Sequence, residues 1–574
     1  MLWVMSSRAS IVVVSLLSLP ACGGSRSDAG IEEDGLDTTG VTGDGDGDPS
    51  GDGDGDPSGD GDGDPSGDGD PSGDGDGDPI KFDFGIPDAS DTGGIPGDVC
   101  KVSDNMNAVG ECEEFAPPDS FEPSIQWTFG PSERSWVTPL VGNFTDDNED
   151  GEIDLCDIPD AILVSNTSIS YGTDCYVHFL DGATGVEHFN IPPTEHVSCV
   201  ATPAFGDIDN DGLPELVTVW NSPGGVFRLK AFEHDGTVKW TNTTDGGNAN
   251  QFYRQSGAVA IHDLDADGDP EIVFNHEVYD SSGVLLWEKI NPQPGELEAS
   301  VAVDLDGDGL MEVVTGHSAY HFDGSEVFEN YPTIPGQSIP QIGNLDADPD
   351  PEIFVTSGVG LFLVEHDGAI KWGPVTPTGI APAGYLVWQR PGTIHDFDGD
   401  GVAEMASSSR EYYAVYEGPT PADVLWQAMV SDNSGAAGGT AFDFLGDGVA
   451  EAMYADEQFM RIYDGLSGAV LLQQARYSAT ISEYPTVADV DNDGSAEILV
   501  VSMNTEPALQ VIRDVEDRWI QARRIWNQHA YYVTNVREDG TIPQQPINNW
   551  ETLNTYRTNA QIEGGGLCKP DPQG

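Results

Sequence analysis

Short apolar segments alternate with acidic turns along most of the chain. Residues 202–206, 300–303 and 485–488 each lead into an acidic turn, and residues 215–219 and 271–274 each follow one. Apolar runs this short, bounded by Asp and Gly, predict buried β-strands. The same region shows no sustained helical periodicity, so the pattern predicts an all-β fold.

A second recurring feature is a turn that leads into an apolar or aromatic segment, as from Asp235 to Trp240 and from Asp367 to Trp372. We interpret it as a hairpin leading to an outer strand. Two strands around the acidic turn and two around the hairpin make one four-stranded sheet per repeat. Similar turns begin at Asp181, Ser282, Asp323 and Asp464.

The spacing of the repeats predicts the fold. The acidic turns begin at residues 143, 207, 263, 304, 344, 396, 443 and 489, which are 40 to 64 residues apart. Such periods indicate solenoids, propellers or arrays. Four-stranded sheets repeated around a centre form a β-propeller, which we predict for residues 121–545.

Five of the turns read Asp-x-Asp-x-Asp-Gly-x-x-Glu with one spacing. Oxygen atoms at positions 1, 3, 5 and 9 can surround a hard cation if the backbone turns sharply after position 5, where Gly permits the required dihedral angles. Calcium suits such a site better than magnesium, which dehydrates reluctantly. The predicted ligands are Asp207, Asp209, Asp211 and Glu215; Asp263, Asp265, Asp267 and Glu271; Asp304, Asp306, Asp308 and Glu312; Asp396, Asp398, Asp400 and Glu404; and Asp489, Asp491, Asp493 and Glu497.

Two further turns are altered. In one, Pro349 stands where Gly is expected, and we predict a different turn with its ligands retained. In the other, Leu445 replaces the second ligand, and we expect weak or no metal binding. Their candidate ligands are Asn344, Asp346, Asp348 and Glu352, and Asp443, Asp447 and Glu451.

The first turn is expanded. Asn143 stands in the opening position, and Asp160 takes the place of the closing Glu. The residues between them match the EF-hand loop pattern, so a separate calcium there is a hypothesis. A solvated turn is the alternative for any single copy, but eight copies in similar context favour metal. The EF-hand-like ligands are Asp146, Asn148, Asp150 and Asp157.

These residues carry a resemblance to a known family. The acidic loop between two apolar strands resembles the FG-GAP, or VCBS, repeat that builds the propeller of integrin α chains. That resemblance implies a calcium-binding propeller, usually of seven blades. Eight loops leave seven or eight blades, and we favour eight. Residues 125–129 resemble the outer strands at Trp240 and Trp372, so we expect them to complete the last blade and close the ring.

The end of the chain differs in character, because residues 519–535 and 549–557 are rich in Trp, Tyr, His and Arg. This part resembles the closing segment of lipid-anchored FG-GAP proteins of myxobacterial type, and we assign residues 546–574 as the closing segment. Aromatic side chains that plug and seal the final blade are the favoured interpretation. A ligand pocket is the alternative.

The start of the chain predicts export. An apolar run at residues 11–19 is too short to span a membrane and is typical of a signal peptide. The following Leu-Pro-Ala-Cys resembles a lipobox, so residues 1–21 are a predicted lipoprotein signal peptide and Cys22 the lipidated residue. Ordinary signal-peptidase cleavage is the alternative. Residues 22–98 include a Gly-Asp-Pro-Ser tract with 14 Asp, which predicts a disordered tether.

Cysteine usage agrees with export. Apart from Cys22, six cysteines remain, an even number that predicts three disulfides in an exported chain. Within the lead-in, residues 99–120, Cys100 and Cys112 form the most local pair. The other four are Cys156, Cys175, Cys199 and Cys568.

Charge and motifs limit the possible functions. The formal net charge is −78, with only 22 Lys and Arg, so nucleic acid is excluded as a partner. The sequence contains no Gly-x-Ser-x-Gly, His-Glu-x-x-His or phosphate-loop motif. His262 and His395 directly precede opening aspartates, and we interpret them as strand-capping or ligand-orienting residues instead of catalytic ones.

Two function classes stay open. The first is a monomeric, calcium-stabilised module, lipid-anchored in the cell envelope at the outer membrane or cell surface, that binds an extracellular protein or glycan. The second is an exported enzyme on the same scaffold. It would act on polysaccharides or be a quinoprotein-like dehydrogenase, since the Asp-Gly-Ala-Thr-Gly turn at residues 181–185 resembles the blade turns of such dehydrogenases.

The ranking of the loops gives a testable prediction. Asp306→Ala removes a ligand from a complete loop, so it should eliminate one bound calcium and lower the melting temperature. Asp447→Ala alters a loop that already lacks a ligand and should do much less. Calorimetry with elemental analysis checks this, and equal effects at the two positions would contradict the ranking.

Overall fold

The computed structural model describes residues 100–101, 106, 109–117, 120–167, 172–222, 225–243, 256–293, 298–376, 391–417, 423–432, 437–481, 483–503 and 506–570. The predicted signal peptide (1–21), the lipidation site Cys22 and the tether (22–98) lie outside the described residues. Contacts divide the chain into residues 1–89 and residues 90–574. The fold below is that of the second unit.

Five of the sheets are four-stranded and antiparallel, with each strand hydrogen-bonded to the next one in sequence. They are β12 (Val259–His262), β13 (Glu271–Phe274), β14 (Glu277–Tyr279) and β15 (Leu285–Glu288); β16 (Val301–Val303), β17 (Glu312–Val314), β18 (Ser318–Tyr320) and β19 (Glu326–Glu329); β20 (Ser338–Gly343), β21 (Glu352–Ser357), β22 (Gly360–Glu365) and β23 (Ile370–Val375); β24 (Thr393–His395), β25 (Glu404–Ser408), β26 (Tyr412–Tyr416) and β27 (Val424–Met429); and β28 (Gly439–Phe442), β29 (Glu451–Ala455), β30 (Phe459–Tyr463) and β31 (Val470–Ala475).

A nine-stranded sheet contains two more such groups. The short strand β7 (Val197–Ser198) joins them because it pairs with one strand of each. The groups are β3 (Leu140–Gly142), β4 (Asp160–Ser165), β5 (Thr173–Asp181) and β6 (Glu187–Ile191), and β8 (Ala204–Gly206), β9 (Glu215–Ser222), β10 (Val226–Phe232) and β11 (Val238–Thr241).

The last four-stranded sheet joins the two ends of the described chain. Its order is β2 (Pro123–Phe129), β34 (Leu509–Asp514), β33 (Glu497–Val501) and β32 (Thr486–Ala488). The early strand β2 pairs antiparallel with β34, with Trp127 opposite Val511. The prediction that residues 125–129 complete the last sheet is therefore confirmed.

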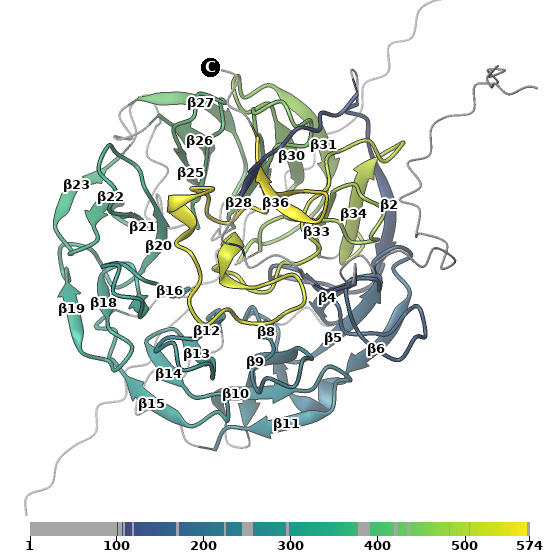
Figure 1. The fold of residues 1–574 in the computed structure, drawn as a ribbon, viewed down its shortest axis with the longest axis horizontal. Helices are drawn as coiled ribbons and strands as arrows, with labels where there is room; N and C mark the ends of the chain where they lie inside the picture. Colours follow the sequence, from purple (N-terminus) through teal and green to yellow (C-terminus); the bar gives the residue numbers. More distant parts are fainter. Residues whose placement is uncertain are drawn as a thin grey trace, which may run out of the picture. The chain divides into compact units, whose positions relative to one another are not determined.

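The described residues thus form eight four-stranded groups, each containing one acidic loop. Figure 1 shows them arranged around a common centre, with β8, β12, β16, β20 and β28 as the innermost strands of their groups and β2 at the outside of the last group. This is the predicted all-β propeller architecture. The helical content among the described residues is three short 3-10 helices, and no described helix has the length and apolar character needed to cross a membrane.

Neighbouring sheets contact each other through the hairpin turns. The indole Nε1 of Trp240 donates to Ser281 O in the next turn (2.8 Å), and that of Trp287 donates to Phe322 O (2.7 Å). The turn glycine Gly324 has φ +80°, and a Cβ there would lie 2.9 Å from Trp287 Cγ. Glycine is required both for the left-handed backbone and for the close approach of the ring. This explains why a glycine with positive φ precedes six of the outer strands, at Gly185, Gly236, Gly283, Gly324, Gly368 and Gly468.

The C-terminal segment, residues 515–570, crosses the centre of the molecule (yellow in Figure 1). It includes η2 (Val533–Asn535), η3 (Asn549–Glu551), β35 (Gln561–Glu563) and β36 (Gly566–Lys569). Its large side chains are buried, with Trp526 and Tyr531 0% exposed. The predicted aromatic plug is therefore confirmed.

The plug is more extensive than the sequence indicated, because it contacts all eight groups and not the last one alone. Its amide, hydroxyl and backbone groups pair with polar atoms at the inner strands, which would otherwise be buried without partners. The contacts are Trp526 with Val141, Gly540 with Asp207, Gln528 with Ile261, Tyr532 with Ala302, Asn554 with Asn344, Tyr556 with Ile394, Arg557 with Thr440, and Asn559 with Val487.

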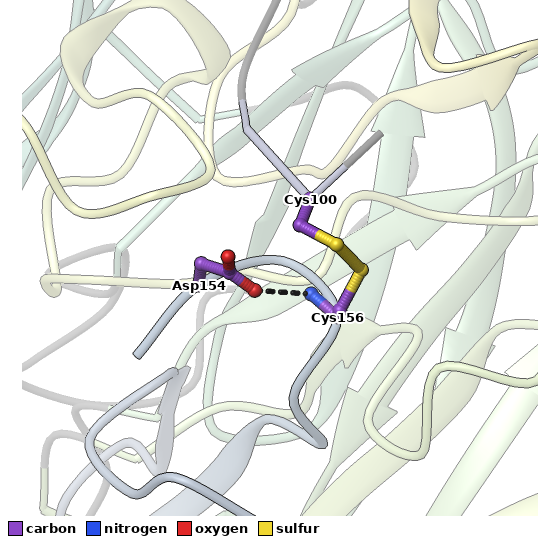
Figure 2. Close-up of side chains that lie close together, drawn as sticks. All are labelled: Cys100, Asp154 and Cys156. Carbon is purple, nitrogen blue, oxygen red and sulfur yellow. Dashed lines mark hydrogen bonds between the residues drawn. A yellow bond between two sulfur atoms is a disulfide. The ribbon is translucent and has the colours of Figure 1, made fainter. Parts of the chain in front are cut away.

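Three disulfides are present, as the cysteine count predicted, but the expected local pair is wrong. Cys100 pairs with Cys156, Cys112 with Cys568, and Cys175 with Cys199. Strand β1 (Gly110–Glu111) pairs with β36, which brings Cys112 to the C-terminal segment. Figure 2 shows the Cys100–Cys156 bridge beside Asp154, whose carboxylate accepts the Cys156 amide (2.9 Å). Both sulfurs are in the disulfide, so this group is not a thiolate metal site.

The hairpin packing predicts unequal effects of two glycine substitutions. Gly324→Ala should lower the free energy of unfolding by roughly 1–2 kcal/mol for the left-handed backbone and by roughly 1–3 kcal/mol more for displacing the Trp287 ring. Gly225 has a similar φ of +78° with nothing within 4 Å of an added Cβ, so Gly225→Ala should incur only the first cost. Equal losses in chemical denaturation would contradict this packing.

Candidate metal centre

The acidic loops lie together on one face of the ring. Each joins the innermost strand of a group to the strand beside it, as from β8 to β9 and, in the last group, from β32 to β33. The bridge between Thr202 and Ala258 is parallel, so neighbouring first strands run in one direction and their loops emerge on the same side. Adjacent loops also touch, as where Asn210 Nδ2 donates to Gly268 O (2.9 Å). The acidic loops therefore surround the C-terminal segment (residues 515–570, the central segment) on this face.

The closing carboxylate has one role in every loop. One of its oxygens accepts the backbone amide of the residue after the opening Asp or Asn, at 2.7 to 3.0 Å. Asp160 does this in the first loop, as its sequence position predicted. The pairs are Phe144 with Asp160, Ile208 with Glu215, Leu264 with Glu271, Leu305 with Glu312, Leu345 with Glu352, Phe397 with Glu404, Phe444 with Glu451, and Val490 with Glu497.

The opening aspartate fixes the sharp turn. In the loop that begins at Asp263, the Gly268 amide donates to Asp263 Oδ2 (2.8 Å), and Gly268 has φ +97°. The same bond from the sixth-position glycine occurs in the other four complete loops and in the Asp443 loop. A side chain would strain this conformation. The Asp-to-Gly spacing is therefore a requirement of the turn itself.

Several loops bring carboxylate oxygens close enough to share one cation. Ligand atoms lie within 4.8 Å of one another in three of the predicted sets. Each set supplies three carboxylate oxygens, part of the roughly six to eight oxygen ligands that calcium takes. The sets are Asp207, Asp209 and Glu215; Asp263, Asp265 and Glu271; and Asp304, Asp306 and Asp308.

The closing carboxylates are buried, and burial raises their pKa values. Glu404 is 0% exposed, and burial, together with the nearby charges of Asp398 and Asp396, raises its pKa to about 9. Burial likewise raises the pKa of Glu271 to about 8, with Asp265 adding to the effect. A buried carboxylate favours its neutral form unless a positive charge compensates it. A cation bound in the loop would therefore stabilise the charged form of the closing carboxylate.

The loop with the missing ligand is covered by other parts of the chain. Leu445 stands at the third position, and its carbonyl accepts the Ala116 amide (2.8 Å) from the lead-in. Ile520 of the central segment donates its amide to Phe444 O (3.0 Å). Protein backbone thus covers this loop from two sides.

The EF-hand-like residues form a second turn inside the first loop. Asp146 Oδ2 accepts the Gly151 amide (2.9 Å), as an opening aspartate does elsewhere. Asp157 is 0% exposed, and its two oxygens accept the amides of Asp147, Asn148 and Asp154. Asp157 therefore stabilises the loop through three hydrogen bonds from backbone amides.

Basic side chains that the sequence analysis overlooked also reach some loops. Lys239 Nζ lies 3.0 Å from Glu215 Oε1, and Lys371 Nζ lies 2.9 Å from Glu352 Oε1. His188 approaches Asp160 with its Nδ1 at 3.2 Å. Each precedes the aromatic residue of an outer strand, which is the sequence signal that could have identified them.

The two histidines that precede opening aspartates are structural. His262 is 1% exposed, and burial lowers its pKa to about 3. Its ring lies 3.3 Å from Gln528 Nε2 of the central segment. Burial lowers the pKa of His395 to about 4, and its Nδ1 contacts the Asp396 carbonyl (2.9 Å). Both side chains are neutral at pH 7 and pack beneath the loops.

Comparison with known proteins supports the fold. No model of a protein family and no curated protein matches the chain. The crystal structure of the Vibrio cholerae biofilm matrix protein Bap1 is similar, with a TM-score of 0.64 and 20% identity over 77% of this chain and 99% of Bap1. A rhamnogalacturonan lyase of Bacillus licheniformis has a TM-score of 0.47 and 18% identity, covering 70% of this chain and 76% of the lyase. At 20% identity the likeness to Bap1 shows a propeller-like fold alone, and the FG-GAP resemblance stays a prediction.

The buried carboxylates predict a pH dependence when divalent ions are removed. Because the folded-state pKa values of Glu271 and Glu404 are raised, these two side chains contribute stability at low pH that is lost as the pH rises through about 8 and 9. In chelator, the melting temperature should therefore fall between pH 5 and 9. Glu271→Gln and Glu404→Gln should reduce the slope, whereas Glu326→Gln on an outer strand should not. A slope unchanged by the first two substitutions would contradict this origin.

Proposed function

We propose that this protein is an exported, lipid-anchored binding module whose acidic-loop face recognises an extracellular protein or glycan, and that calcium ions in the loops stabilise it. The observation that carries the proposal is the buried closing carboxylate repeated in every loop. A propeller that binds no cations would not need a buried carboxylate at each of these positions, because burying a charge without compensation is costly.

Calcium is the cation that fits these loops best. The donors are carboxylate, amide and carbonyl oxygens with no cysteine among them, which favours a hard cation. The number of ligand side chains differs between loops. The complete copies have four, and the Asp443 loop has three. Calcium accepts such variation, whereas magnesium demands near-octahedral geometry.

The acidic-loop face also contains hollows that can receive part of a ligand. Two hollows lie where the central segment meets the loops. One is lined by Asp396, Asp443 and Gln561, and the other by Asp304 and Gln545. Amide and carboxylate groups beside a bound cation are suited to hydroxyl-rich or acidic ligands, since the cation can share its open coordination positions with ligand oxygens.

Location at the cell surface rests on several observations together. Three disulfides are formed, which is typical of oxidising compartments. The lipobox-like sequence at Cys22 and the acidic tether would hold the propeller away from the membrane. The fold is also similar to that of a biofilm matrix protein. These observations support the binding function over a cytosolic role.

Calcium should stabilise the protein in a concentration-dependent manner. At a free concentration a hundredfold above Kd, each site adds about 2.7 kcal/mol to the free energy of unfolding. Calorimetry in a calcium series should show a rising melting temperature, and magnesium at equal ionic strength should give a much smaller rise. A melting temperature that is the same in chelator and in calcium would contradict the proposed role of the loops.

The binding function is tested with purified protein and a panel of neutral and acidic polysaccharides. We expect saturable binding that is lost in chelator, with no new reducing ends and no unsaturated products. Turnover of a polysaccharide, or dye reduction in the presence of pyrroloquinoline quinone, would instead support the alternative of an exported enzyme on this scaffold.

A further inference from the structure

We propose that one residue on each outer strand determines whether its loop needs a metal ion. By this rule, the loops that begin at Asp207 and Asn344 hold the ammonium groups of Lys239 and Lys371 in place of a divalent ion and bind no such ion. The Asp263 loop and the loop of Glu404 carry leucine at the equivalent position and bind one ion each. The inference rests on the proposed calcium binding and specifies where it occurs.

The position is equivalent in all eight groups. Third and fourth strands pair with an irregularity that leaves one residue of the fourth strand without a partner. Such a β-bulge changes the direction in which the side chain of the extra residue points. In the second group, for example, Trp240 pairs with Ala231 and Val238 pairs with Phe232, so Lys239 is skipped. The skipped residues are His188, Lys239, Leu286, Val327, Lys371, Leu425, Leu471 and Gln126.

Lys239 occupies the ligand side of its loop. Its Nζ lies 2.5 Å from Asp209 Oδ2, 3.0 Å from Glu215 Oε1 and 3.1 Å from Glu233 Oε2. Asp209 and Glu215 are positions 3 and 9 of the loop, so the ammonium contacts two of the predicted calcium ligands. An ammonium group has three donors, and here all three have carboxylate partners.

Lys371 repeats this arrangement in another group. Its Nζ contacts Asp346, lies 2.9 Å from Glu352 Oε1 and lies 2.9 Å from Glu365 Oε1. Asp346 and Glu352 are again loop positions 3 and 9, and Glu365, like Glu233, opens the hairpin turn. The same cation with the same three partners in two separate groups indicates a defined internal counter-ion.

Of the three groups with leucine at this position, the two with a complete ligand set leave carboxylate oxygens without partners. Asp263 Oδ1 and Glu404 Oε1 are buried and have no hydrogen-bond donor within the part of the chain that the structure describes. These side chains are 1% and 0% exposed, respectively. The bulge residues there, Leu286 and Leu425, provide no charge. A buried carboxylate oxygen without a donor is stable in its charged form only beside a cation, and these loops retain the full ligand set to bind one.

A lysine and a divalent ion exclude each other at this position. Both would occupy the space between positions 3 and 9, and two cations in contact repel strongly where water is largely excluded. Gln126, at the equivalent position of the last group, is uncharged and donates to Asp491 Oδ2 (2.6 Å). It leaves Glu497 Oε1 without a donor among the described residues, so a polar side chain alone does not replace the ion.

The test exchanges the bulge residues and counts bound calcium. The full-length chain is stripped of metal, titrated with Ca²⁺ alone and analysed by native mass spectrometry and elemental analysis. Lys239→Met and Lys371→Met should each add one ion per chain, and the double variant should add two. Leu286→Lys and Leu425→Lys should each remove one ion. Lys289→Met removes a lysine outside the loops and should leave the count unchanged.

The outcomes separate this inference from the proposed function. If the unsubstituted protein binds no calcium, both fail. If it binds calcium but the methionine variants gain none and the lysine variants lose none, the bulge rule is overturned while the binding module stands. The leucine-to-lysine direction keeps the test decisive if a methionine variant does not fold. Leu286 is 52% exposed, so its replacement should be tolerated.

Discussion

The structure depends on a buried carboxylate at the start of the second strand of each sheet. That carboxylate accepts a backbone amide at the start of the acidic loop, so it joins the two ends of the loop at the point where the chain reverses. The opening aspartate then binds the glycine amide and completes the turn. Because one oxygen is used for the backbone, the other lies in a poorly solvated site, where the charged form of the carboxylate needs a compensating positive charge. The shape of the loop and its need for positive charge thus have the same cause.

The ring requires constraints that act across the whole molecule. Strand β2 closes the last sheet with residues nearly four hundred positions away, and the Cys112–Cys568 disulfide joins the lead-in to the C-terminal segment. The central segment then pairs with the inner strand of every group. Tryptophan and glycine contacts connect neighbouring sheets at the outside. The acidic loops are therefore held between two connected layers, which fixes their positions relative to one another on a single face.

Much of this organisation was predictable because it is local and repeated. The Asp-Gly spacing, the short apolar runs and the glycine hairpins each determine a few residues of backbone, and their recurrence indicates a propeller. Even the ring-closing strand could be identified, because residues 125–129 resemble the other outer strands. The disulfide partners could not, because they depend on where the lead-in crosses the face. The nearest pair in sequence, Cys100 with Cys112, was the wrong choice for this reason. The roles of Lys239 and Lys371 were also missed, since a β-bulge reverses the side expected from simple alternation along a strand.

The most direct test of the account is a crystal structure of the calcium-loaded protein with anomalous scattering data collected to locate the ions. The account predicts anomalous peaks about 2.3–2.6 Å from the carboxylates of Glu271 and Glu404, and none beside Glu215 and Glu352, where lysine ammonium groups lie. Well-ordered loops with no peak at Glu271 and Glu404 would contradict the central claim that cations compensate the buried carboxylates.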